Sequence, residues 1–217
     1  MKKGLTELVM ILDKSGSMAG LEGDTIGGYN AMLEKQRKIE GECHITTVLF
    51  DNDITLLHDR TNLKAVSPIT QKEYQVGGCT ALLDAIGLSI QKIGNAQKHT
   101  AEEYQAEKVI FVIITDGAEN ASRVFSPDKV KKMIKKQKER YQWEFIFLGA
   151  NIDAVETASH FGIAADRAQN FHADSQGIEV NFSAMSAAVS AFRQANSVPD
   201  DWNKDIKLDY QRRGRNR

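Results

Sequence analysis

Three short runs of consecutive apolar residues stand out along the chain, at residues 8–12, 109–114 and 145–148. Each is followed within a few residues by Asp or Gly. Runs of this length without polar alternation are typical of parallel strands that are covered on both faces. A buried helical segment is the alternative, but the short length and the β-branched content favour strands.

Between and after these runs, apolar residues recur every three or four positions, which is the period of an amphipathic helix. Four stretches share this pattern: residues 26–39, 82–93, 130–141 and 182–192. Alternating strands and helices predict βαβ units, and therefore a doubly wound, mostly parallel sheet with helices on both faces.

One pair of segments breaks the alternation. Residues 43–50 and 54–58 are both rich in strand-forming residues, and only Asp51-Asn52-Asp53 separates them. This spacing predicts a hairpin, which would give the sheet one antiparallel edge strand. Turn chemistry explains the two hairpin carboxylates. A last weak strand is expected near residues 169–172.

The length of 217 residues favours one domain, which we place at residues 1–200. Residues 201–217 are interpreted as a basic, flexible C-terminal tail, because four of the last seven residues are Arg and none of them is apolar.

The composition gives no sign of a membrane or nucleic-acid partner. Lys and Arg number 28 against 29 Asp and Glu, so the formal net charge is −1. The chain contains no run of 18 apolar residues and no apolar segment typical of a secretory signal before Glu7. Its two cysteines fit a reducing compartment, so we expect a cytoplasmic protein.

The polar residues that follow the predicted strands are the candidate site. In open parallel sheets, ligands bind beyond the carboxyl ends of the strands. Asp13, Ser15 and Ser17 follow the first strand, Asp116 follows the strand at 109–114, and Thr80 precedes the helix at 82–93. Carboxylate and hydroxyl oxygens without thiolate or imidazole favour Mg²⁺ or Mn²⁺ over zinc.

Two neighbouring features have a second interpretation. Thr80 is also suited to cap the helix that follows it. Asp84 lies one turn further on; it could bond a metal-bound water or a loop hydroxyl, but complementing the helix N-terminus is the favoured interpretation.

Three motifs occur together in order: Asp-x-Ser-x-Ser at residues 13–17, Gly-x-Thr-x-Leu at 78–82 and Thr-Asp-Gly at 115–117. In this combination the chain, over roughly residues 5–195, resembles the von Willebrand factor A family and its metal-ion-dependent adhesion site. The resemblance implies a six-stranded sheet with the antiparallel strand at one edge. It also implies a bound Mg²⁺, with Mn²⁺ or Ca²⁺ as alternatives, held by Asp13, Ser15 and Ser17 in the first loop, Thr80 in the second and Asp116 in the third.

The same resemblance implies a function. In this family one coordination position of the cation is left for an Asp or Glu of a partner protein, and affinity often switches when the third-loop Asp leaves the ion and the Thr approaches. Similar stand-alone bacterial domains are associated with stress-response, metal-resistance and chaperone-type assemblies, so an ATPase or a stress-response assembly is a candidate partner.

Two other function classes fit less well. A metal-assisted phosphohydrolase or phosphotransferase that uses an aspartyl phosphate would need a second Asp where Ser15 stands. A nucleotide-binding switch would need a Gly-x-x-x-x-Gly-Lys-Ser/Thr loop or a Gly-x-Gly-x-x-Gly turn after a strand, and the sequence has neither. We therefore expect a binding module, an intracellular adaptor, rather than an enzyme.

Overall fold

The computed structural model describes residues 1–214 as one sheet flanked by helices. The strands are β1 (Lys2–Asp13), β2 (Cys43–Phe50), β3 (Ile54–Asn62), β4 (Ala106–Thr115), β5 (Glu144–Gly149) and β6 (Ala168–Asn170). The α-helices are α1 (Glu22–Arg37), α2 (Leu82–His99), α3 (Pro127–Tyr141), α4 (Ala154–His160), α5 (Ser175–Ala195) and α6 (Lys204–Gly214). Short 3₁₀ turns are η1 (Gly16–Met18), η2 (Leu63–Ala65), η3 (Glu102–Tyr104) and η4 (Ala165–Arg167).

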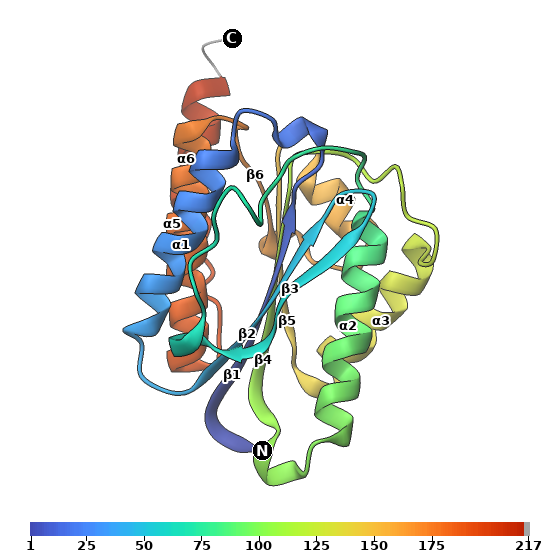
Figure 1. Cartoon of the computed structure of the whole chain (residues 1–217), viewed down its shortest axis with the longest axis vertical. Coiled ribbons are helices and arrows are strands. Elements are labelled where there is room, and N and C mark those ends of the chain that lie inside the picture. The colour runs from blue at the N-terminus through green and yellow to red at the C-terminus, as the bar shows by residue number, and fades with distance from the viewer. Residues whose placement is uncertain (215–217) are drawn as a thin grey trace.

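The six strands lie in the order β3-β2-β1-β4-β5-β6 (Figure 1). Strand β1 pairs in parallel with both β2 and β4, and the order reverses direction at this point. Only the β2–β3 pair is antiparallel among the described strands, and β3 is an edge strand. The predicted mostly parallel, six-stranded sheet with one antiparallel edge strand is therefore confirmed.

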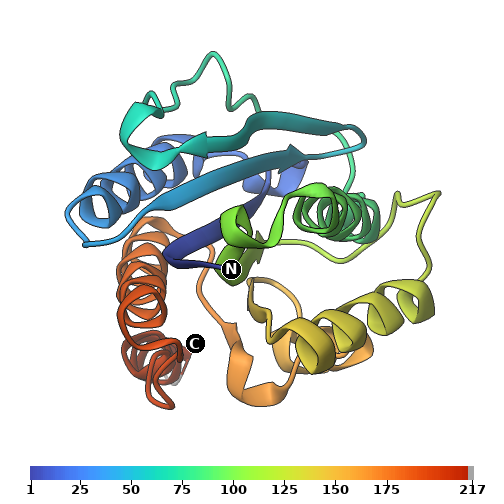
Figure 2. The same ribbon diagram turned by 90° about the horizontal axis from the view of Figure 1, so that it is seen from below.

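Helices cover both faces of the sheet, and alternate residues of each strand point to opposite faces. Leu8, Met10 and Leu12 pack in one core with apolar residues of α1, α5 and α6. Val9 and Ile11 pack in the other core with residues of α2, α3 and α4. Seen from below, the two helical layers lie on opposite sides of the sheet (Figure 2). This double cover explains why the central strands read as continuous apolar runs.

The helices predicted from periodicity are all present. The apolar stripe of α2 (Leu82, Ile86, Ile90, Ile93) is buried against the sheet. Helix α3 begins at the Ser126–Pro127 pair, where the Ser126 side chain accepts the Lys129 N–H and Pro127 occupies the first turn. Helix α4 was not predicted, because its seven residues, AVETASH, are too few to show a period.

The expected flexible tail differs from the structure over residues 204–214, which form α6. Trp202 and Ile206 are buried against the α1–α5 layer, and Arg213 forms ion pairs with Asp174 and Asp209. Apolar anchors spaced four residues apart, together with these ion pairs, hold this segment on the domain. The rest of the predicted tail, residues 215–217, lies outside the described residues.

Among residues 1–214, no helix combines the length and apolar character needed to cross a membrane. Cys43 is buried and Cys79 is exposed, and both are free thiols.

Candidate functional site

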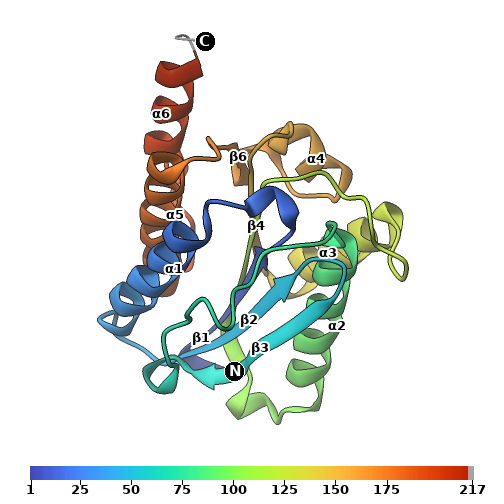
Figure 3. The same cartoon turned by 45° about the horizontal axis from the view of Figure 1, so that its top comes forward.

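Three loops meet at the carboxyl edge of the sheet. The first follows β1 and contains η1, the second precedes α2, and the third follows β4 (Figure 3). Because β1 and β4 are neighbouring parallel strands, their ends lie side by side. The second loop is joined to the first by a hydrogen bond from the Gly16 N–H to the Gly78 carbonyl, 3.0 Å long.

The first loop folds around the Asp13 carboxylate. Asp13 Oδ1 accepts the Ser15 N–H at 2.7 Å, and the next residues form the short turn η1. Met18, at the end of that turn, is buried in the core under α1 and α5 and anchors the loop. Asp13 and Ser15 are each about 1% exposed, whereas Ser17 is exposed, so the site opens to solvent at Ser17.

A chain of side-chain hydrogen bonds links the first and third loops. The Ser17 hydroxyl donates to Asp116 Oδ1 at 2.5 Å, and the Ser15 and Ser17 hydroxyl oxygens lie 3.2 Å apart. Asp116 itself is only 1% exposed. A hydrogen bond thus joins Ser17 and Asp116, which are 99 positions apart in the sequence.

Thr80 completes the cluster from the second loop. A Cβ atom placed on Gly117 would lie 3.2 Å from Ser17 Oγ and 3.4 Å from Thr80 Oγ1, so both hydroxyls border the same small space. The structure therefore brings all five predicted site residues to one place. The expectation that Thr80 caps α2 is wrong, because Ala81 occupies the N-cap position and Glu119 Oε2 accepts the Leu83 N–H.

Sequence reasoning missed two residues that hold Asp13. The Thr115 hydroxyl donates to Asp13 Oδ2 at 2.6 Å, and the buried Tyr74 hydroxyl donates to the Asp13 carbonyl oxygen. Thr115 stands in the Thr-Asp-Gly motif, so the motif contained this signal. Tyr74 lies in the irregular segment between η2 and α2, and no sequence pattern marks it.

Asp84 also behaves differently from expectation. Its carboxylate accepts the backbone N–H groups of Arg123 at 2.7 Å and Phe125 at 2.8 Å, in the third loop. It therefore binds the third loop rather than the N-terminus of its own helix.

The interpretation of the hairpin carboxylates as turn residues is confirmed, since Asp51 Oδ1 accepts the Asp53 N–H at 2.7 Å. Asp51 also pairs with Lys14.

The ionised forms of the two carboxylates in the cluster are electrostatically unfavourable in the absence of a cation. Burial raises the pKa of Asp13, against the opposing effect of hydrogen bonds from Ser15 and Thr115. Burial, together with the nearby charge of Asp13, raises the pKa of Asp116 to about 6, although the Ser17 hydrogen bond opposes this. A cation placed between the two carboxylates would stabilise their ionised forms.

The cluster also contains an oxygen that is free to bind a cation. Asp116 Oδ2 is buried and has no hydrogen-bond partner among the described residues. A buried, unpaired carboxylate oxygen is costly, and structures seldom keep one without a partner. With the hydroxyls of Ser15, Ser17 and Thr80, the donors are all oxygen, which fits Mg²⁺, Mn²⁺ or Ca²⁺. Residues 1–214 contain no group of three or more His, Cys, Asp or Glu side chains suited to a metal. The site at the carboxyl edge instead combines two carboxylates with three hydroxyls.

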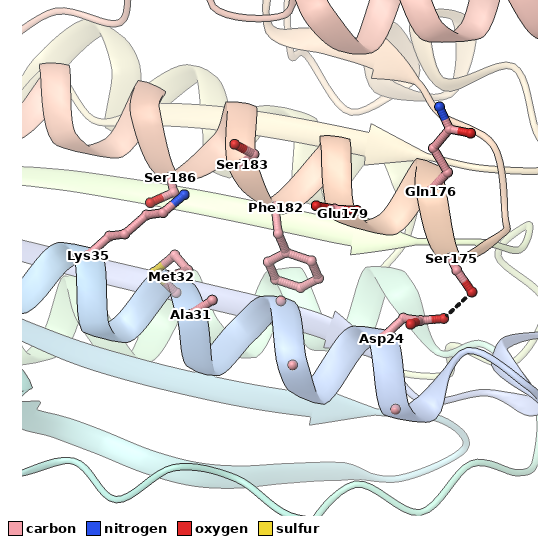
Figure 4. Close-up of a pocket in the computed structure, with 13 residues that line it drawn as sticks. Asp24, Ala31, Met32, Lys35, Ser175, Gln176, Glu179, Phe182, Ser183 and Ser186 are labelled. Carbon is pink, nitrogen blue, oxygen red and sulfur yellow. Dashed lines mark hydrogen bonds between the residues drawn. The ribbon is translucent and has the colours of Figure 1, made fainter.

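A separate groove of about 640 Å³ lies between α1 and α5 (Figure 4), and none of the five candidate site residues lines it. Small residues of α1 form one wall, and Phe182 of α5 points toward Gly28. Of its lining residues, Asp24, Lys35 and Glu179 carry charge, and Asp24 accepts a hydrogen bond from Ser175 at 2.6 Å. This lining has none of the converging donors found at the carboxyl edge.

Comparison with known proteins places the fold. No protein-family model and no curated protein matches the sequence. Among solved structures, a von Willebrand factor type A protein from Catenulispora acidiphila matches with a TM-score of 0.59 at 14% identity, over 86% of this chain and 43% of that one. The fold is von Willebrand factor A-like.

Two further solved structures show the same architecture. The PilB minor pilin from Streptococcus sanguinis matches with a TM-score of 0.60 at 11% identity, over 89% of this chain and 63% of that one. The mussel byssus proximal thread matrix protein 1, in a structure described as having a zinc-occupied MIDAS motif, gives 0.57 at 12% identity, over 85% of this chain and 46% of that one. This chain therefore covers 43% to 63% of the length of these three neighbours, and the likeness concerns the fold alone.

Proposed function

We propose that this protein is a metal-dependent protein-binding module that captures an Asp or Glu side chain of a partner through a divalent cation held at the carboxyl edge of its sheet. The metal ligands would be Asp13, Ser15, Ser17, Thr80 and Asp116. Mg²⁺ is the proposed cation, with Mn²⁺ and Ca²⁺ as alternatives. The proposed setting is an intracellular adaptor, and an ATPase or stress-response assembly is a candidate partner.

The single observation that carries this proposal is the buried oxygen Asp116 Oδ2, which has no hydrogen-bond partner within residues 1–214. It lies in a cluster whose two carboxylates both have raised pKa values. Within residues 1–214, negative charge gathers there and neither Asp13 nor Asp116 has an ion-pair partner. At the same edge Lys14 pairs with Asp51 instead. A cation from solution would supply the missing charge and would offer a coordination position to an external carboxylate.

Several residues around the site have distinct parts in this proposal. Thr115 and the Ser15 N–H orient the Asp13 carboxylate, and Tyr74 fixes the carbonyl of the same residue. Ser17, the exposed member, lies where a partner side chain would approach. Gly117 leaves the space between the Ser17 and Thr80 hydroxyls open, because any side chain there would contact both.

Metal binding is tested by unfolding the protein in Mg²⁺ and in EDTA. At a Mg²⁺ concentration one hundred times the dissociation constant, the wild type should gain about 2.7 kcal/mol of stability. Asp116→Asn should lose this gain. Asp53→Asn, the same substitution at an exposed hairpin carboxylate of the same edge, should keep it. Equal stability of the wild type in Mg²⁺ and EDTA would argue against the site.

Partner capture is tested by affinity purification from the source lysate in Mg²⁺ and in EDTA, with wild type, Asp116→Asn and Asp53→Asn as baits. A partner that fits the proposal is retained by wild type and Asp53→Asn in Mg²⁺, and is lost in EDTA and with Asp116→Asn. Changing each surface Glu to Gln, and each Asp to Asn, in the purified partner should then identify one carboxylate whose loss abolishes binding. If none does, the carboxylate mechanism is wrong.

The enzyme alternative is separated by a turnover assay. Purified protein in Mg²⁺ or Mn²⁺ is incubated with aryl phosphates and nucleoside triphosphates, and Asp116→Asn serves as the control for contaminating activity. The binding-module proposal expects the same background rate from both proteins. Turnover by the wild type that Asp116→Asn abolishes would favour a phosphohydrolase.

A further inference from the structure

The backbone around Thr80 is held by other loops. Three consecutive N–H groups of the second loop each donate to a residue from elsewhere in the chain. Cys79 N–H donates to the Asn52 side-chain oxygen, Thr80 N–H to Asn120 Oδ1 at 2.8 Å, and Ala81 N–H to the Asp51 carbonyl at 2.9 Å. The hairpin between β2 and β3 therefore holds this loop on one side, and the third loop holds it on the other.

Asn120 binds Thr80 at both of its backbone groups. Its side-chain oxygen accepts the Thr80 N–H, and its own N–H donates to the Thr80 carbonyl at 3.1 Å. Ala121 N–H donates to the same carbonyl at 3.2 Å. The peptide groups on either side of the Thr80 Cα are thus fixed relative to the third loop, which carries Asp116 four residues before Asn120.

Two carboxylates extend this connection into α2. Glu119 accepts the Leu83 N–H at 2.8 Å and the Ser122 N–H at 2.7 Å, so it binds the first turn of α2 and its own loop together. Asp84, from α2, accepts N–H groups of the third loop in return. Because the bonds run in both directions, the second and third loops form one unit, to which Thr80 and Asp116 both belong.

We propose that Asn120 is a positioning residue for Thr80, which holds the Thr80 hydroxyl at a fixed distance from Asp116 so that the cation site keeps a single geometry. This inference rests on the proposed function. It applies the principle that groups behind the ligands of a metal set their orientation, and that loss of such a group weakens metal binding.

The role differs from that of a residue needed for folding. Asn120 is exposed, and in the hydrogen bonds that involve its side chain its partner is the Thr80 backbone. Its replacement therefore leaves no cavity in the core. The consequence should appear in metal affinity and in the exchange of the Thr80 amide rather than in the fold.

The experiment measures Mn²⁺ affinity by electron paramagnetic resonance for wild type, Asn120→Ala, Asn120→Asp and Asn62→Ala. Asn62 is the matched control, because it is also exposed and its Oδ1 accepts a backbone N–H, that of Lys64, at 3.0 Å in η2. Asn120→Ala should bind Mn²⁺ about tenfold more weakly. Asn120→Asp, which keeps the acceptor oxygen, should restore affinity to within about threefold of wild type, and Asn62→Ala should equal it.

Amide hydrogen exchange supplies a second readout without metal. In EDTA, the Thr80 amide should exchange at least about tenfold faster in Asn120→Ala than in wild type, while amides of β1 and β4 stay equally protected. If wild type binds Mn²⁺ and Asn120→Ala binds equally well, or if Asn120→Asp is as weak as Asn120→Ala, the positioning role is overturned. Failure of the wild type to bind Mn²⁺ would instead overturn the proposed function.

Discussion

The two edges of the sheet treat buried charge in opposite ways. At the amino edge, Lys108 and Arg193 are buried cations. Lys108 Nζ donates to the Arg193 carbonyl at 2.5 Å, near the end of α5. Arg193 donates to the Gln36 carbonyl at 2.5 Å and to the Gly41 carbonyl at 3.2 Å, beside the end of α1. Each cation thus meets carbonyls at a helix C-terminus, where the helix dipole favours positive charge.

At the carboxyl edge, neither buried carboxylate of the site has an ion-pair partner within residues 1–214. Burial raises the pKa of both Asp13 and Asp116, and the nearby charge of Asp13 raises the pKa of Asp116 further. One Asp116 oxygen has no hydrogen-bond partner among the described residues. The same fold that satisfies two cations at one edge leaves two carboxylates short of positive charge at the other. The difference teaches that unsatisfied charge, rather than burial of charge itself, marks a candidate binding site.

The largest effect on stability is expected from a substitution at the amino edge, where the buried cations have hydrogen-bond partners. Arg193→Met removes the buried guanidinium that donates to the Gln36 and Gly41 carbonyls, so we expect a loss of about 3 kcal/mol or more in the free energy of unfolding. Urea denaturation measures it. Arg140→Met, at an exposed position of α3, is the control and should change stability by less than about 0.5 kcal/mol. Equal effects of the two substitutions would remove the contrast between the edges.

A smaller effect of opposite sign is expected at the carboxyl edge. In EDTA at pH 8, Asp116→Asn should be more stable than wild type by about 2 kcal/mol, since it removes a buried charge while keeping the oxygen that accepts from Ser17. The pKa of Asp116 is raised from 3.8 to about 6 in the folded protein, so wild-type stability falls as pH rises between these values. The advantage of the variant should therefore shrink toward pH 4. A variant less stable than wild type at pH 8 would show that the chain does satisfy this carboxylate.

The smallest effect concerns the residue that holds Asp13. Thr115→Val removes the hydroxyl that donates to Asp13 and should lower stability by about 1 kcal/mol. Thr100→Val removes a hydroxyl that donates to the Ala96 carbonyl at 2.7 Å, at the end of α2, and should cost a similar amount. Isothermal titration with Mg²⁺ separates the two, because only Thr115→Val should weaken binding, by about tenfold. Equal Mg²⁺ affinity would mean that Thr115 has a structural role alone.

Much of the fold was predictable because its signals are local. The apolar runs at 8–12 and 109–114 lie within β1 and β4, and the stripe of α2 is read directly from four spaced residues. Helix α6 was missed for a physical reason. Its few apolar residues, such as Ile206, stand in a polar, Arg-rich segment, and their burial depends on a surface formed by distant parts of the chain.

The site residues show the same division between local signals and contacts with distant parts of the chain. Asp13, Ser15, Ser17, Thr80 and Asp116 were predicted, because motifs after strands are local signals and parallel strands bring their ends together. The residues that hold them were not. Asn120 acts on Thr80 from 40 positions away and Thr115 on Asp13 from 102, through hydrogen bonds whose partners only the folded chain defines.

The most direct test of the central claim is the stoichiometry of cation binding at the carboxyl edge. Metal-free wild type, titrated with Mn²⁺ and followed by electron paramagnetic resonance, should bind one ion per chain, and excess Mg²⁺ should displace it. Asp13→Asn and Asp116→Asn should each abolish this binding while the fold persists in EDTA. Binding of the ion with unchanged affinity in both variants, or no saturable binding by the wild type, would contradict the account.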